Sequence, residues 1–334
     1  MKLVMKSKTI TNEDRRSSDT IQRILAFAAL IILFVGFSFA SPYFFTFSNV
    51  VGILIATAVN GLLALGVTFI IISGGIDLSV GTVMTLSSVM TAVGIVRWNL
   101  PVTLGVILGI FTGGLAGFTN GIMISKLKLP PFIATLGMLN VARGLSLVIT
   151  DLSPIYFPYE TGFSKVAMGS ILGAVIPGFE IPNGVLIMFG VALIAGLILS
   201  KTVIGRYSFA LGSNEEAARL SGVNIVFWKT AIYTLGGIFV GIAGVVIAAR
   251  LNSAQPALGQ GYELDAIAAA VIGGISMSGG EGTMVGTIIG AFIISTLTNG
   301  LRIMSVPQEW QIVVTGLIII SAVYLDILRR RGKT

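Results

Sequence analysis

Six polar or charged side chains lie in or beside long apolar stretches, where they could contact a polar solute. They are Asn60, Asp77, Asn140, Arg143, Asp265 and Asn299. Burying such a group in hydrocarbon without a partner costs several kcal/mol. The three asparagines and Arg143 therefore either form hydrogen bonds between helices or line a hydrated path through a membrane. Asn140 and Arg143 are three residues apart, so they share a helix face.

Asp77 follows two glycines in the stretch TFIIISGGIDLSVGTVM at residues 68–84. Gly74 and Gly75 predict the end of one helix, and Asp77 is positioned to cap the next helix by accepting its backbone N–H groups. Asp77 is thus either a structural cap near the inner interface or part of a gate or substrate contact. Asp265, beside Glu263 near the outer start of a later span, admits the same two interpretations.

The polar segment ALGSNEEAARLSGVNI at residues 210–225 predicts a helix of about two turns. Ser213 and Glu216 have capping-box spacing, and Gly222 supplies a C-terminal stop. So short a helix is marginal in water, so it lies either on this protein's own inner surface or on a cytosolic partner. A partner would contact Ser213, Glu215, Glu216, Ala217, Ala218, Arg219 and Gly222.

Several kinds of chemistry are absent from the sequence. There is no cysteine and no histidine, which excludes disulfides, thiol nucleophiles, Cys/His metal sites and imidazole catalysis. No G-x-x-x-x-G-K-[ST] stretch is present, so we expect no ATP hydrolysis by this chain. We expect no enzyme activity, no cofactor and no metal. A transporter of this kind must draw its energy from a partner or from a gradient.

The composition predicts an all-α, polytopic membrane protein, because 54% of the 334 residues are hydrophobic and 10% are charged. Cations beside the apolar spans account for the net charge of +7, and their distribution puts both termini in the cytoplasm. We therefore expect no nucleic-acid partner. The ten predicted spans are 24–40, 50–72, 79–96, 102–124, 131–150, 183–200, 230–249, 264–279, 283–300 and 310–327.

The spans form one predicted domain, and the first is interpreted as an uncleaved anchor. The apolar run 166–176 is too short to span and predicts an interfacial or re-entrant helix. The predicted parts are a basic cytoplasmic segment at 1–23, a transmembrane domain at 24–327 with an inner coupling segment at 201–229 and a larger outer loop at 151–182, and a basic cytoplasmic tail at 328–334.

Glycines recur every four residues in two of the spans, which predicts close approach of neighbouring helix backbones. Gly74-Gly75-Ile76 also resembles Gly273-Gly274-Ile275, which indicates partial internal repetition. The first glycine series is Gly105, Gly109, Gly113, Gly117 and Gly121, and the second is Gly282, Gly286 and Gly290.

The chain resembles the membrane-spanning permeases of bacterial ABC importers for monosaccharides, of the ribose type. The resemblance covers most of the chain in the expected order. It rests on GGIDLSVG at 74–81, FIATLGM at 132–138, GRYSFALGSNEEAARLSGVN at 205–224, ARLNSAQPALGQGYELDAIAAAVIGG at 249–274 and SGGEGTMVGTIIGA at 278–291. Met277 and Glu281 depart from the family pattern, which has a different residue and a cation there.

The resemblance implies a multi-pass protein of the inner membrane, surrounded by lipid, that translocates a sugar by alternating access. The expected partners are a second permease copy in a homodimer, a cytosolic ATP-binding subunit and an extracytoplasmic sugar-binding protein. Residues 213–222 are similar to the family's EAA-x-x-x-G coupling segment and would dock on the ATPase. Which sugar is carried stays open, and an ion-coupled secondary sugar carrier is the alternative.

Overall fold

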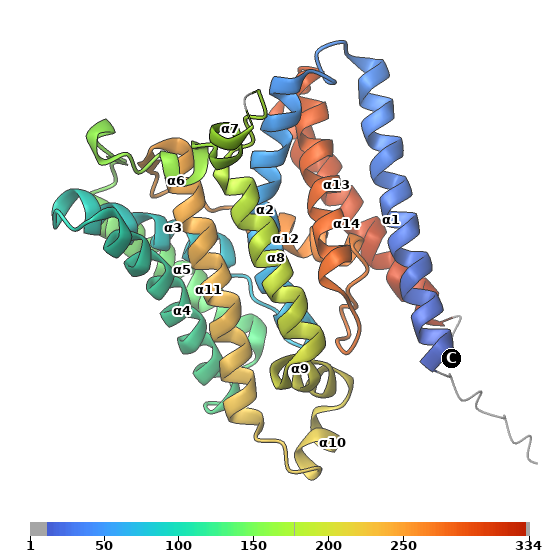
Figure 1. Cartoon of the computed structure of the whole chain (residues 1–334). Coiled ribbons are helices and arrows are strands. Elements are labelled where there is room, and N and C mark those ends of the chain that lie inside the picture. Colours follow the sequence, from blue (N-terminus) through green and yellow to red (C-terminus); the bar gives the residue numbers. More distant parts are fainter. Residues whose placement is uncertain (1–11, 177, 332–334) are drawn as a thin grey trace, which may run out of the picture.

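The computed structural model describes residues 12–176 and 178–331, which fold almost entirely into α-helices (Figure 1). The long helices are α1 (Asn12–Ala40), α2 (Phe47–Ile72), α3 (Val80–Ala92, continued by a π-helical turn at Val93–Arg97), α4 (Val102–Ser125), α5 (Pro131–Thr150), α8 (Asn183–Lys201), α11 (Ile225–Leu251), α12 (Tyr262–Ile272), α13 (Met284–Ile303) and α14 (Gln308–Arg331). The short elements are β1 (Ile155–Tyr156), a 3-10 turn at Tyr159–Thr161, α6 (Lys165–Met168), α7 (Ile171–Val175), α9 (Val203–Ser213), α10 (Glu215–Leu220) and β2 (Ser253–Ala254).

Seven helices of the described chain are long and apolar enough to cross a membrane: α2, α3 with its π-helical end, α4, α5, α8, α11 and α13. The predicted spans 24–40 and 310–327 lie in α1 and α14, whose apolar parts, Ile24–Ala40 and Gln308–Ser321, are shorter. The chain is thus an all-α polytopic membrane protein, but the count of ten spans is not confirmed.

The predicted span 264–279 is wrong as a single helix. α12 has only 11 residues and ends at Ile272. At about 1.5 Å per residue, such a helix covers roughly half of a hydrocarbon core about 30 Å thick. The apolar run continues past this point, but Gly274 adopts a left-handed conformation with φ +95° and stops the helix.

α11 packs mainly against α2, α3 and α4. The predicted glycine strip of α4 makes the last of these contacts possible. A Cβ on Gly113 would lie 2.4 Å from the carbonyl oxygen of Gly237, and one on Gly117 would lie 2.2 Å from that of Tyr233. The prediction that this strip admits another helix backbone is confirmed.

The second glycine series serves the contact between α12 and α13. A Cβ on Gly286 would lie 2.0 Å from the oxygen of Gly273, and one on Gly290 would lie 1.9 Å from that of Ala269. Gly282, the first member of the series, lies in the loop before α13. This packing prediction therefore holds for the two glycines inside the helix.

The segment 151–182 is joined to the chain that follows α11 by a two-stranded antiparallel sheet. Ile155 pairs with Ala254, and Tyr156 pairs with Ser253. The apolar run 166–176 does not form one continuous helix, because α6 ends at Met168 and α7 begins at Ile171. These short elements lie at one end of the molecule, and α9 and α10 lie at the other, here called the α10 end (Figure 1).

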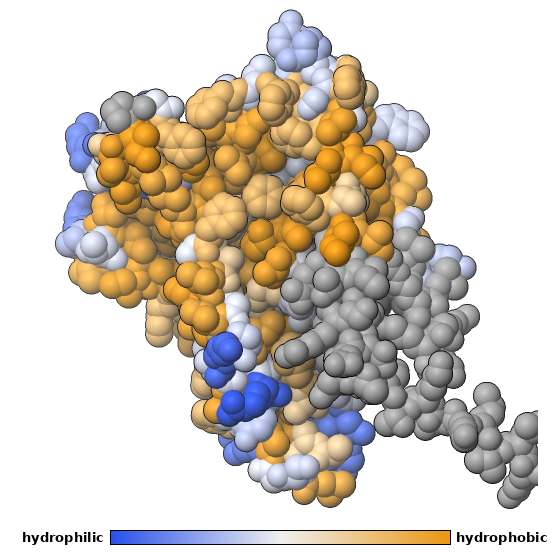
Figure 2. All heavy atoms as spheres, turned by 45° about the vertical axis from the view of Figure 1, so that its right-hand side comes forward, coloured by the Kyte–Doolittle hydropathy of each residue, from blue (hydrophilic) through white to orange (hydrophobic). Residues whose placement is uncertain are grey.

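The surface matches this arrangement. Hydrophobic residues cover most of the body in the view of Figure 2, and hydrophilic residues gather towards the α10 end. The beginning of α1 and the end of α14 also lie at the α10 end (Figure 1). The bundle therefore places a polar segment and both of these helix ends on one side of an apolar body.

Candidate functional site

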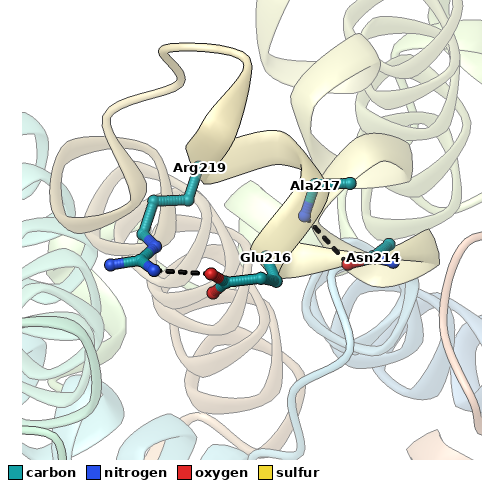
Figure 3. A network of polar contacts seen from close by, with 4 residues as sticks. All are labelled: Asn214, Glu216, Ala217 and Arg219. Carbon is teal, nitrogen blue, oxygen red and sulfur yellow. Dashed lines mark hydrogen bonds and ion pairs between the residues drawn. The ribbon is translucent and has the colours of Figure 1, made fainter.

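The polar segment 210–225 forms a helix, but its cap differs from the predicted one. α10 has six residues and begins after Asn214, whose Oδ1 accepts a hydrogen bond from the backbone nitrogen of Ala217 at 2.9 Å (Figure 3). The predicted cap, Ser213, is instead the last residue of α9. Because the two helices are joined by one residue, only Asn214 leaves helical geometry, with φ −163°, and only it can cap.

Glu216 does not complete a capping box either, since its carboxylate pairs with Arg219 (Figure 3). The hydrogen bond and charge of Glu216 raise the pKa of Arg219 above its usual value. The predicted stop at Gly222 is confirmed. Gly222 has φ +85°, and its N–H donates to the carbonyl of Arg219 at 3.0 Å.

α10 lies on its own protein with one face and leaves the other face open. Ala218 is buried, and Glu215 forms an ion pair with the largely buried Lys229 of α11. Leu220, in contrast, is 79% exposed, and the side chains of Glu216 and Arg219 are each 64% exposed. The helix is therefore anchored to the bundle while it presents an apolar residue and a polar pair outward.

The last turn of α9, directly before α10, packs against the end of α2. The N–H of Gly280 donates to the carbonyl of Ile72 at 2.8 Å. A Cβ on Gly212 would lie 1.8 Å from that carbonyl oxygen and 2.5 Å from the Gly280 nitrogen. Gly279, with φ +81°, fits between Gly212 and Gly74. We call Gly74, Gly212, Gly279 and Gly280 the glycine joint.

Gly74 of the joint also belongs to one of the two turns that suggested internal repetition. Gly74 and Gly274 have φ +79° and +95°, and their N–H groups donate to the carbonyls of Ile71 and Val271. α2 and α12 therefore end in the same kind of turn. By conformation, Gly74 corresponds to Gly274, whereas the sequence comparison placed it against Gly273. The signal for the joint itself was only a set of scattered glycines, because its segments are far apart in the chain.

Asp77 is buried, but it does not cap α3. The residue before α3 is Ser79, and the Asp77 Oδ1 accepts hydrogen bonds from the Ser79 nitrogen at 2.8 Å and from the Ser79 Oγ at 2.6 Å. Asn120 of α4 donates from its Nδ2 to Ser79 Oγ at 3.0 Å and to Asp77 Oδ2 at 3.4 Å. The hydroxyl of Tyr233 donates to the carbonyl of Ile76 at 3.3 Å. The carboxylate thus ties the 73–79 loop to α4, and sequence analysis missed Asn120 as its partner.

Asn60 and Asn299 form hydrogen bonds between α2 and α13. Asn60 Nδ2 lies 3.5 Å from Ser295 Oγ, and Asn299 Nδ2 donates to Asn49 Oδ1 at 2.9 Å. Thr68 and Thr287 make a third contact of 2.7 Å between the same helices. Both asparagines thus have partners on another helix, as the interpretation of an interhelical hydrogen bond required.

Asn140 and Arg143 lie on the exposed face of α5. The amide of Asn140 donates to the carbonyl of Leu136 in its own helix at 3.0 Å. Asp265 is half-buried in the first turn of α12, beside Glu263, whose Oε1 accepts from the Gly261 nitrogen at 3.2 Å. Within the described residues, no hydrogen bond or ion pair joins any two of the six candidate residues, so they do not form one compact site.

Comparison with known proteins identifies the family. The family model described as branched-chain amino acid transport system / permease component matches residues 49–323. The chain is 42% identical to the ribose import permease protein RbsC of Bacillus subtilis (strain 168), over 96% of this chain and 98% of that protein. No solved structure matches the chain significantly.

Two Escherichia coli (strain K12) proteins are also similar. The ribose import permease protein RbsC is 41% identical over 89% of this chain and 91% of its own length. The D-allose transport system permease protein AlsC is 37% identical over 89% of each chain. The chain therefore belongs to the family of bacterial ABC importer permeases that these proteins represent, and it is a multi-pass membrane subunit of the inner membrane.

Proposed function

We propose that this chain forms the translocation path of an ATP-driven importer for ribose or a related monosaccharide. The names of its relatives support the substrate class, because they name ribose or D-allose and the matches cover at least 89% of each chain. The observation that carries the mechanism is the glycine joint, which links the segment before α10 directly to the end of α2 and to the loop after α12.

The proposed orientation puts the α10 end in the cytoplasm, with both termini. The clustering of lysine and arginine at that end supports it. In this arrangement α1 and α14 also cross the membrane, and α12 completes its crossing with the non-helical residues 273–283. The ten crossings of the sequence prediction are retained as a proposal in this form.

The energy for transport comes from a cytosolic ATP-binding subunit that docks on α10. Movement of α10 is transmitted through α9, because only one residue separates the two helices. At the joint, Gly212 bears directly on the bond between Gly280 and Ile72, so a displaced α9 must shift that bond. Two packings of the joint would correspond to paths open on opposite sides.

The path itself lies where two copies of the chain face each other across α5. Asn140 and Arg143 are exposed on that helix, where lipid is a poor neighbour for polar groups. Their amide and guanidinium groups complement sugar hydroxyls. An extracytoplasmic sugar-binding protein delivers the sugar at the opposite end from α10.

Uptake of labelled ribose by proteoliposomes tests the function. The vesicles contain the permease, its ATP-binding subunit and its binding protein, with ATP inside or outside. Uptake that requires ATP on the α10 side and survives an ionophore is the expected result. Uptake that needs only an ion gradient would instead support a secondary carrier and overturn the proposal.

A further inference from the structure

A hollow of about 560 Å³ lies beside α10 at the same end of the molecule. Apolar and charged side chains both line it. Seven of the residues that line it come from α10, the loop after it and the first turn of α11, whereas Lys128 comes from the turn between α4 and α5. The lining residues are Lys128, Glu215, Glu216, Arg219, Val223, Asn224, Ile225 and Val226.

The turn that supplies Lys128 is held in one shape. The N–H groups of Leu127 and Leu129 donate to carbonyls in the last turns of α4, at 3.2 and 3.1 Å. Lys128 has φ +59°, and two prolines follow at 130 and 131, where α5 begins. A non-glycine residue in this conformation is uncommon, and the fixed backbone presents the Lys128 side chain towards the hollow.

Among the described residues, the ion pairs around the hollow leave one lining cation, Lys128, without a partner. Glu215 is paired with Lys229, and Glu216 is paired with Arg219. The Lys128 side chain forms no hydrogen bond or ion pair with any other residue that the structure describes. The lining therefore offers one free positive charge beside two neutralised pairs, which suits an acidic group on a partner.

Two exposed leucines flank the hollow. Leu127 is 61% exposed and precedes Lys128, and Leu220 is 79% exposed and follows Arg219. Each leucine thus lies next to a residue that lines the hollow, on a polar end of the molecule. Exposed apolar side chains among polar ones are typical of surfaces that bind another protein.

We infer that the α4–α5 turn, Lys126–Pro130, is a second contact for the cytosolic ATP-binding subunit, which inserts a projecting segment with an acidic and an apolar side chain into the hollow beside α10. The inference rests on the proposed function, because α10 is the first contact in that proposal. Continuity of the hollow with α10 favours this occupant. An anionic lipid headgroup is the alternative occupant, and the labelling experiment below separates it from the ATP-binding subunit.

Cysteine labelling tests the contact without background, because the chain contains no cysteine. Leu127→Cys, Leu220→Cys and Tyr159→Cys are each reconstituted in nanodiscs of zwitterionic lipid, with and without the ATP-binding subunit. Tyr159 is 87% exposed at the opposite end of the molecule and serves as the control. Binding should slow maleimide labelling at 127 and 220 by about tenfold and leave 159 unchanged.

The outcomes separate the two proposals. Protection at 220 alone would overturn the inference and leave the proposed docking of α10 intact. Protection at neither position would overturn both. Slow labelling at 127 in nanodiscs of anionic lipid without the ATP-binding subunit would assign the turn to the membrane surface and overturn the inference.

A charge reversal gives an independent test on the assembled complex. Lys128→Glu should reduce the ATP-binding subunit retained on the purified permease by about tenfold, because an acidic partner is then repelled. Lys126→Glu is the matched control, since Lys126 is exposed in the same turn but does not line the hollow. Equal losses in the two variants would show a general charge effect and overturn the inference.

Discussion

Gly212 and Gly280 approach so closely that a Cβ on Gly212 would lie 2.5 Å from the Gly280 nitrogen. The N–H of Gly280 is bonded to Ile72, so the missing side chain leaves room for a hydrogen bond that caps the end of α2. Residues from α9, from the end of α2 and from the loop after α12 thus share one small space. Coupling between α10 and the bundle should depend on it.

Gly212→Ala should uncouple ATP hydrolysis from transport. The added methyl group must displace the Ile72 carbonyl, so the bond from Gly280 is lost or lengthened. We expect ATP-driven uptake to fall about tenfold while the ATP-binding subunit stays bound, because α10 itself is unchanged. Uptake and co-purification are measured on the same preparation.

Gly196→Ala is the control for this variant, because a Cβ on Gly196 of α8 meets nothing within 4 Å. Its uptake should equal that of the unmodified protein. Normal uptake by Gly212→Ala would show that the joint tolerates a side chain and does not transmit the movement.

The glycine strip of α4 makes a prediction about stability. In Gly117→Ala the new Cβ would lie 2.2 Å from the Tyr233 oxygen, so α4 and α11 must move apart. Overpacking of this kind costs about 1–3 kcal/mol in the free energy of unfolding. Thermal unfolding in detergent should show a lower midpoint for Gly117→Ala and no decrease for Gly137→Ala, whose Cβ meets nothing within 4 Å.

Local and periodic features of the fold were predictable from the sequence. The apolar lengths of α2, α4 and α11, the packing role of the α4 glycines and the stop at Gly222 all depend on neighbouring residues. The end of α12 was missed because its apolar run continues beyond Gly273 and Gly274, so hydropathy alone extended the helix.

Contacts between distant segments were not predictable. Asn120 is separated from Asp77 by 43 positions, and nothing in either segment points to the other. The cap of α10 was assigned to Ser213 because the sequence did not show that α9 extends to that residue. The glycine joint is the clearest case, since three segments meet there through backbone atoms.

The cap of α10 can be tested by two neighbouring variants. Asn214→Ala removes the acceptor for the Ala217 N–H and should destabilise α10 by about 1 kcal/mol. Ser213→Ala removes a hydroxyl that makes no capping bond and should leave α10 unchanged. Hydrogen exchange at the Ala217 amide measures the difference. Faster exchange in Ser213→Ala than in Asn214→Ala would restore the capping box of the sequence prediction.

The contact between Asp77 and Asn120 predicts rescue by exchange of the two residues. In Asp77→Asn, one carboxylate oxygen is replaced by an amide NH2 group. If this group faces Asn120, two donors meet and the bond from Asn120 is lost. If the amide oxygen faces Asn120 instead, the bonds from Ser79 are lost. We expect thermal stability and uptake both to fall. In the double variant Asp77→Asn, Asn120→Asp, one amide and one carboxylate again face each other, so part of both losses should be recovered. Gly137→Ala, which does not touch this contact, serves as the control for stability. If the double variant is no better than the product of the single effects, the two residues act independently and the charge at position 77 is needed for another reason.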